Sequence, residues 1–116
     1  MTTLYGIKNC DTMKKARQWL DDRGVPYTFH DYKVDGLSEE LAEQWLDDVG
    51  HDVLINKRGT TWRKLDDATK EGLNRETARR LMLANPSIIK RPVLETGGAR
   101  IVGFSQSAYA SLFSNK

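Results

Sequence analysis

Cys10 is the only cysteine among the 116 residues of this chain, and its surroundings favour chemistry. A short apolar run, Leu4–Ile7, precedes it and predicts a buried strand. Apolar residues then return with helical spacing over residues 13–20, so Cys10 should lie where a strand passes into a helix. At the start of a helix, unpaired N–H groups and the helix dipole favour an anion. A thiol there is biased toward thiolate, its reactive form.

The competing interpretation of Cys10 is structural. A lone cysteine is more often a small buried hydrophobe than a nucleophile. Polar residues on both sides, among them Asn9, Asp11 and Thr12, argue against an apolar pocket, and lysines at positions 8, 14 and 15 favour the thiolate. Local context alone leaves both interpretations open.

Composition limits the class of protein. A length of 116 residues suits one domain, and 39% hydrophobic with 29% charged residues fits a soluble globular protein. A net charge of +2 is too small to indicate nucleic-acid binding. No apolar stretch resembles a signal segment or a membrane span, and one cysteine excludes an internal disulfide. We therefore expect a cytoplasmic protein that binds neither membrane nor nucleic acid.

The predicted elements begin with a strand, a helix over about 11–23 and a second strand over 27–32, which together form a parallel βαβ unit. Ser38 should cap a helix that ends at Gly50, and Asn74 a helix that runs to about residue 83. Between them, residues 51–55 form an apolar segment, residues 56–63 a polar loop, and residues 66–71 a short helix.

The last third predicts a hairpin followed by a helix. Residues 88–95 are expected to be extended, Gly97-Gly98 is a hairpin signal, residues 100–104 form the returning strand, and Ser105 or Ser107 caps a final helix. The order β-α-β, helical region, β-β-α is the thioredoxin arrangement. The predicted fold is therefore α/β, a single domain over 1–116 with a four-stranded mixed sheet and a helical insert over about 37–85.

Two stretches, residues 5–12 (YGIKNCDT) and 89–92 (IKRP), together with an arginine beyond the Gly-Gly turn, resemble the ArsC-type arsenate reductase family, in particular its YffB- and Spx-like branch. The resemblance covers essentially the whole chain. It implies a thioredoxin-like fold with an inserted helical region, and an oxidoreductase activity.

The resemblance also implies roles for individual residues. Cys10 matches the family's catalytic thiol, and Arg58, Arg91 and Arg100 match three oxyanion-binding arginines. Pro92 matches a proline that is cis in thioredoxin folds.

This set makes physical sense, because guanidinium groups bind oxyanions through paired hydrogen bonds and would lower the pKa of a nearby thiol. For any one arginine, a solvated surface charge is the competing interpretation. Asn9 and Thr12 are expected to add hydrogen bonds to the thiolate.

The chain also departs from the family pattern. Residues 11–14 (DTMK) replace a Gly-Thr-Ser-Arg-like run that cradles the oxyanion in arsenate reductases, and Asp11 places a negative charge beside the thiol. Met13 stands where Spx regulators carry the second cysteine of a Cys-X-X-Cys switch. An external thiol must therefore resolve any disulfide on Cys10. Glutathione is the simplest candidate, because it is abundant and small.

Other candidate residues are weaker. The only histidines, His30 and His51, make a poor metal set with one cysteine, so we expect no metal and no bound cofactor. Trp19, Trp45 and Tyr109 fall at inward helical positions and should pack in the core, whereas Trp62 could line the site.

Three functions remain. The leading hypothesis is a glutathione-dependent thiol reductase, in which the Cys10 thiolate forms a mixed disulfide that a second thiol releases. The second is an arsenate reductase coupled to glutaredoxin. The third is a non-catalytic regulator that binds RNA polymerase as Spx does.

Overall fold

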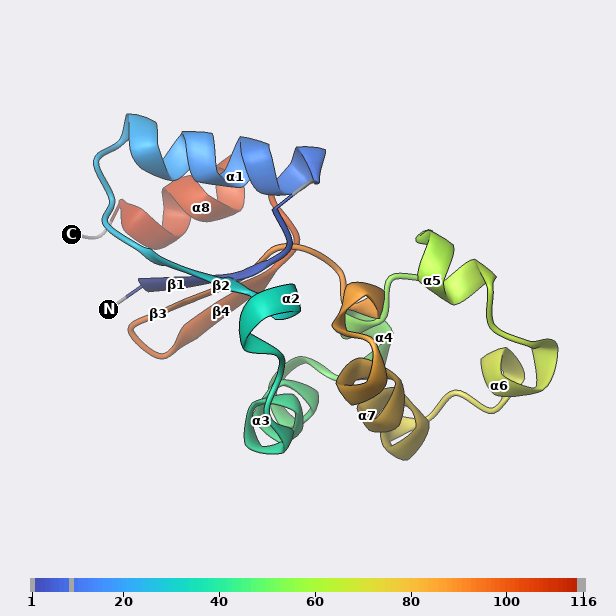
Figure 1. Ribbon diagram of the computed structural model, residues 1–116. Coiled ribbons are helices and arrows are strands. Elements are labelled where there is room, and N and C mark those ends of the chain that lie inside the picture. Colours follow the sequence, from blue (N-terminus) through green and yellow to red (C-terminus); the bar gives the residue numbers. More distant parts are fainter. Residues whose placement is uncertain (1, 9, 115–116) are drawn as a thin grey trace. The chain divides into compact units, whose positions relative to one another are not determined.

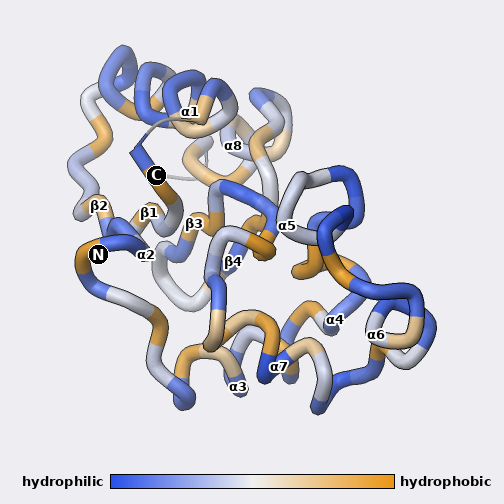
Figure 2. The backbone as a smooth tube through the Cα atoms, turned by 45° about the vertical axis from the view of Figure 1, so that its right-hand side comes forward, coloured by the Kyte–Doolittle hydropathy of each residue, from blue (hydrophilic) through white to orange (hydrophobic). Residues whose placement is uncertain are grey.

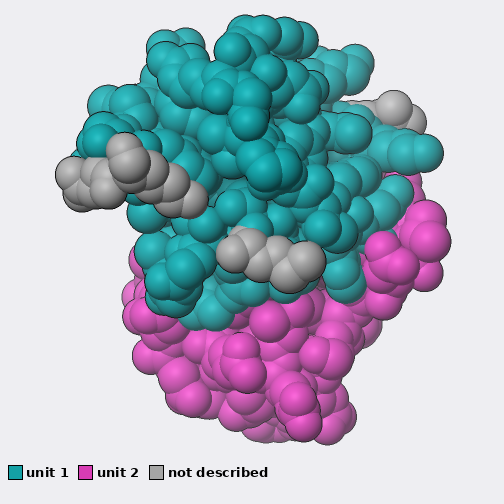
Figure 3. All heavy atoms as spheres, turned by 90° about the vertical axis from the view of Figure 1, so that its left-hand side faces the viewer, with its two compact units in different colours: residues 1–31, 91–116 teal, residues 32–90 magenta. Residues whose placement is uncertain are grey.

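The computed structural model describes residues 2–8 and 10–114. Contacts divide the chain into two compact units (Figure 3). Residues 1–31 and 91–116 form the sheet unit, and residues 32–90 form the helical unit. The helical insert predicted over about 37–85 falls inside the second unit. Within the described ranges, no helix combines the length and the apolar character that crossing a bilayer requires.

The sheet unit contains a βαβ segment, a hairpin and a last helix (Figure 1). Its elements are β1 Thr2–Gly6, α1 Asp11–Asp22, β2 Thr28–Asp31, β3 Val93–Thr96, β4 Ala99–Val102 and α8 Gln106–Phe113. The strand order is β2-β1-β3-β4, with β1 parallel to β2 and antiparallel to β3. A four-stranded mixed sheet with this strand order and these helices is the thioredoxin-like fold that the sequence predicts.

The core of the sheet unit lies between one face of the sheet and the helices α1 and α8, which cover that face together (Figure 1). Leu4 of β1 is paired in register with Leu94 of β3, and both are fully buried. Trp19 of α1 and Tyr109 of α8 meet edge to face with ring centroids 5.5 Å apart. These two residues and the buried Trp45 are core residues, as their helical spacing predicts.

Gly97 and Gly98 join β3 to β4 as a two-residue hairpin turn. Their φ angles are +53° and +85°, the left-handed region that such a turn requires and that glycine adopts without strain. The turn sets the register of the hairpin, so Glu95 lies opposite Arg100.

The helical unit consists of short helices. They are α2 Tyr32–Asp35, α3 Glu39–Val49, α4 His51–Leu54, α5 Thr60–Arg63, α6 Asp67–Glu71, α7 Arg75–Ala84 and the 3-10 turn η1 Pro86–Ile88. Ser38 caps α3 and Asn74 caps α7, each accepting a hydrogen bond from a backbone N–H three residues later. Figure 2 shows hydrophobic residues recurring among hydrophilic ones along these helices, which is the pattern of half-buried helices.

Three local predictions are wrong. Residues 60–63 form a helical turn rather than a loop, and residues 32–35 form another, so the strand predicted over 27–32 ends at Asp31. The extended segment predicted from residue 88 begins later, because Pro86 starts a 3-10 turn that ends at Ile88.

Candidate functional site

Cys10 is the N-cap residue of α1. Its backbone is extended, with φ −140° and ψ 128°, and its carbonyl accepts the first helical hydrogen bond from the N–H of Lys14 at 3.0 Å. Thr12 and Met13 therefore occupy the second and third helical positions, whose N–H groups point toward an N-cap side chain. Cys10 packs against the core of the sheet unit and is only partly exposed.

The electrostatic surroundings of Cys10 favour its thiolate. Partial burial alone would raise the pKa of the thiol, but this effect is outweighed. The backbone N–H of Met13, the side chain of Arg91 and the backbone N–H of Thr12 all stabilise the charged sulfur, so the pKa of Cys10 lies below its ordinary value.

Sheet topology explains why Arg91 meets Cys10 across eighty residues of sequence. β1 and β3 are antiparallel, with Tyr5 opposite Val93. The end of one strand therefore lies beside the start of the other. Cys10 follows the end of β1 and Arg91 precedes the start of β3. The bond between Arg91 and Pro92 is cis, the conformation that the resemblance implies for Pro92.

Arg100 has a different environment from Arg91. Its guanidinium forms an ion pair with Glu95 on the neighbouring strand, and its Nε donates to Oε2 of Glu95 at 2.7 Å. Both side chains are mostly buried, at 14% and 22% exposure. Its predicted role in substrate binding stays a prediction.

A polar cluster lies on the sheet face opposite Leu4 and Leu94, because successive residues of a strand point to opposite faces. Tyr5 donates a hydrogen bond to Glu95, and burial together with this carboxylate raises the pKa of Tyr5 to about 12. The ring of His30 lies 4.8 Å from that of Tyr5, measured between centroids.

Arg58 belongs to the helical unit. Its backbone N–H donates to Oδ1 of Asn56 at 3.1 Å, and its side chain lines an open groove of about 540 Å³ together with Lys57 and Lys90. Lys57 also lies over the ring of Trp62, with Nζ 5.7 Å from the centroid.

The structure thus brings Cys10, Arg91 and Thr12 together. Thr12 acts through its backbone N–H, and Asn9 lies outside the described residues. Sequence reasoning missed the N–H of Met13 and the carboxylate of Glu95. The signals were present: an N-cap residue always faces the N–H groups at the second and third helical positions, and a two-residue turn at Gly97-Gly98 sets Glu95 opposite Arg100.

Comparison with solved structures finds proteins of the same fold over nearly the whole chain. A protein called YFFB is 54% identical with a TM-score of 0.92, covering 96% of this chain and 97% of its own. The solution structure of an arsenate reductase (ArsC) related protein from Brucella melitensis is 52% identical with a TM-score of 0.79, covering 97% and 93%.

Curated relatives extend the comparison. An uncharacterized protein of Haemophilus influenzae is 46% identical over 97% of this chain and 99% of its own length. The global transcriptional regulator Spx 1 of Oceanobacillus iheyensis is more distant, at 28% identity over 91% and 82%. The ArsC family model matches residues 5–112. This chain therefore belongs to the ArsC family, among the proteins related to arsenate reductases.

Proposed function

We propose that this protein is a glutathione-dependent thiol reductase with Cys10 as its nucleophile. The observation that carries the proposal is the position of Cys10 at the N-cap of α1, where two helix N–H groups and the guanidinium of Arg91 lower the pKa of its thiol. A thiolate is the attacking species in thiol–disulfide exchange.

The reaction follows from the presence of a single cysteine. On a mixed disulfide between a substrate thiol and glutathione, the Cys10 thiolate attacks the glutathione sulfur. A disulfide forms between Cys10 and glutathione as the substrate leaves as a thiolate. The thiolate of a second glutathione then attacks the glutathione sulfur on Cys10, which frees Cys10 and yields oxidised glutathione. One disulfide is reduced and one is formed, so no further electron donor is required.

Arg91 supports this choice of thiol. Glutathione carries two carboxylates, and a guanidinium offers them paired donors. Arg58 and Arg100 are proposed to bind anionic parts of the substrate as well, as are Asn9 and Thr12.

The test is the intact mass of the protein after brief exposure to oxidised glutathione, with the rate followed against pH. We expect one glutathione adduct that forms readily below the pH at which an ordinary thiol ionises, and none on Cys10→Ser. An inert Cys10, or one modified only in alkali, contradicts the proposal.

Arsenate reduction coupled to glutaredoxin is the second candidate, favoured by the arsenate reductase related protein of Brucella melitensis. Arg91 beside a thiolate suits an oxyanion that the sulfur attacks, whereas the carboxylate of Asp11 next to Cys10 opposes its binding. Arsenate-dependent consumption of reduced nicotinamide in a coupled glutaredoxin assay supports this candidate, and its absence removes it.

A third candidate, a regulator that binds RNA polymerase, is favoured by the similarity to Spx 1. Copurification with polymerase that persists in Cys10→Ser supports it. A protein that does not copurify with polymerase contradicts it.

A further inference from the structure

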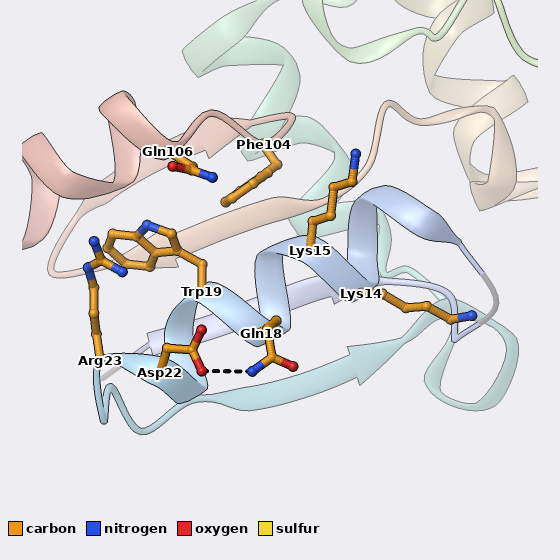
Figure 4. Close-up of a pocket in the computed structure, with 8 residues that line it drawn as sticks. All are labelled: Lys14, Lys15, Gln18, Trp19, Asp22, Arg23, Phe104 and Gln106. Atoms are coloured by element: carbon orange, nitrogen blue, oxygen red, sulfur yellow. Dashed lines mark hydrogen bonds between the residues drawn. The ribbon is translucent and has the colours of Figure 1, made fainter.

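A groove of about 480 Å³ runs along α1 in the sheet unit (Figure 4). Two rows of side chains from α1 and its C-cap, each spaced by four residues, line one side of it, and the start of α8 with the chain just before it lines the other. The first row is Lys14, Gln18 and Asp22, the second is Lys15, Trp19 and Arg23, and Phe104 and Gln106 lie across from them.

The groove starts one turn along α1 from Cys10. Residues four apart on a helix lie above one another on the same face. Continuing the first row back by four residues from Lys14 reaches Cys10, and the backbones of these two residues are joined by a hydrogen bond of 3.0 Å. The groove therefore begins about one helical turn from the backbone of Cys10.

The charge of the groove is positive. Lys14 and Lys15 are exposed at one end, and Arg23 at the other lies over the ring of Trp19, with its guanidinium carbon 4.0 Å from the centroid. The one lining carboxylate, Asp22, accepts a hydrogen bond from Gln18 at 2.7 Å. Three cations against one carboxylate favour an anionic occupant.

The length of the groove decides what kind of anion fits. The α1 residues that line the groove, from Lys14 to Arg23, cover about 13 Å at 1.5 Å per residue, and Cys10 lies about 6 Å before them, so a segment that runs from Cys10 to Arg23 spans about 20 Å. An extended peptide covers this distance with about six residues at 3.3 Å each, whereas a tripeptide such as glutathione covers about half of it. The partly exposed ring of Phe104, with amides from Gln18 and Gln106, suits a peptide with side chains and a backbone.

We propose that this groove docks an extended acidic segment flanking the cysteine of a protein substrate. The thiol of that substrate then lies at Cys10 while its acidic residues lie against Lys14, Lys15 and Arg23. The reaction of the docked substrate rests on the proposed function, but the docking itself does not require the thiol of Cys10.

The test is fluorescence anisotropy with two labelled hexapeptides that contain no thiol, one with three aspartates and one with asparagines in their place. At low ionic strength we expect the acidic peptide to bind at least about tenfold more tightly, with the difference lost in high salt. Lys14→Glu and Lys15→Glu should each remove most of the difference. Gln106→Glu, on the α8 side of the groove, should do the same without disturbing the helix, because an acidic residue suits its first turn.

Lys64→Glu is the matched control, an exposed lysine of the helical unit that should leave binding unchanged. Equal affinity for the two peptides, or indifference to the groove substitutions, overturns the proposal. Complete displacement by millimolar inorganic phosphate also overturns it, because it indicates a small-anion site. Cys10→Ser should bind both peptides as the unchanged protein does, so failure of docking and failure of the thiol chemistry are measured separately.

Discussion

The acidity of the Cys10 thiol has two sources that differ in range. The N–H groups of Thr12 and Met13 come from the same helix and are present wherever α1 forms. The guanidinium of Arg91 comes from the start of β3 and is present only when β1 and β3 are paired. Reactivity of this residue therefore reports on tertiary structure as well as on the helix.

Replacing Arg91 separates the two sources. Arg91→Ala removes both a hydrogen bond and a positive charge from the thiolate, so the pKa of Cys10 should rise and the pH profile of glutathione adduct formation should move to higher pH. Arg91→Lys keeps the charge but loses the planar donors, and its profile should lie between the two. A profile unchanged in Arg91→Ala would mean that the helix alone activates the thiol.

Two buried tyrosines form a matched pair. The hydroxyl of Tyr5 donates to Glu95, whereas that of Tyr109 has no hydrogen-bond partner among the described residues. Tyr5→Phe should lower the free energy of unfolding at pH 7 by about 1–2 kcal/mol, and Tyr109→Phe should leave it unchanged or raise it by about 1 kcal/mol. Urea denaturation of the unchanged protein and the two variants measures both changes in the free energy of unfolding. An equal loss of stability in the two variants would contradict the difference in hydrogen bonding between Tyr5 and Tyr109.

Alkaline pH should also act through Tyr5. Its pKa is about 12 in the folded protein against 10 ordinarily, so the unfolded chain loses this proton first as the pH rises. The contribution of Tyr5 to stability should therefore fall between pH 10 and pH 12. The free energy of unfolding of the unchanged protein should exceed that of Tyr5→Phe by less at pH 11.5 than at pH 9. Denaturation of both proteins at the two pH values measures this difference. A constant difference would rule out the raised pKa.

The junction of β1 and α1 depends on a close contact. Gly6 ends β1, and a Cβ placed there would overlap Sδ of Met13 and lie 2.7 Å from its Cε. Met13 is fully buried and also supplies an N–H to the thiolate. The absence of a side chain at residue 6 thus allows the first turn of α1 to approach the strand and to orient its donors.

Gly6→Ala should cost about 1–3 kcal/mol of folding free energy, because the buried Met13 has to move. Glutathione adduct formation should also slow, since the N–H of Met13 moves with it. The double variant Gly6→Ala/Met13→Ala provides the control: removing the obstructing atoms should make its cost smaller than the sum of the single costs. Additive costs would exclude the contact as the cause.

Local signals predict most of these elements, and long-range packing accounts for the errors. Ser38 and Asn74 cap helices where the sequence predicts caps, since capping depends on a few neighbouring residues. The helical turns at 32–35 and 60–63 lack periodicity long enough to reveal them. The contact between Cys10 and Arg91 could be expected only from the family resemblance, because spacing alone does not indicate which arginine reaches the thiol.

At the scale of the whole molecule, the predicted substrate-binding arginines come from both compact units. Arg91 and Arg100 belong to the sheet unit, and Arg58 to the helical unit. A role for Arg58 in binding an anionic substrate is therefore best tested by function.

Arg58→Ala should slow glutathione adduct formation by about fivefold at limiting substrate, the effect of losing one charge-assisted contact. Arg63→Ala is the control, because it removes an exposed arginine from the same unit. Equal rates for the two variants would mean that Arg58 is an ordinary surface charge and takes no part in substrate binding.

The sheet unit is assembled from two separate stretches of chain, residues 1–31 and 91–116, with the helical unit between them. This order has a consequence during synthesis. A ribosome adds about 5–20 residues per second, so roughly 4–16 s pass between the emergence of Cys10 and that of Arg91. The helical unit is continuous in sequence and emerges during that interval, whereas β1 still lacks its neighbour β3. The nascent chain thus carries its nucleophile through the synthesis of the whole helical unit before Arg91 can complete the activation of that nucleophile.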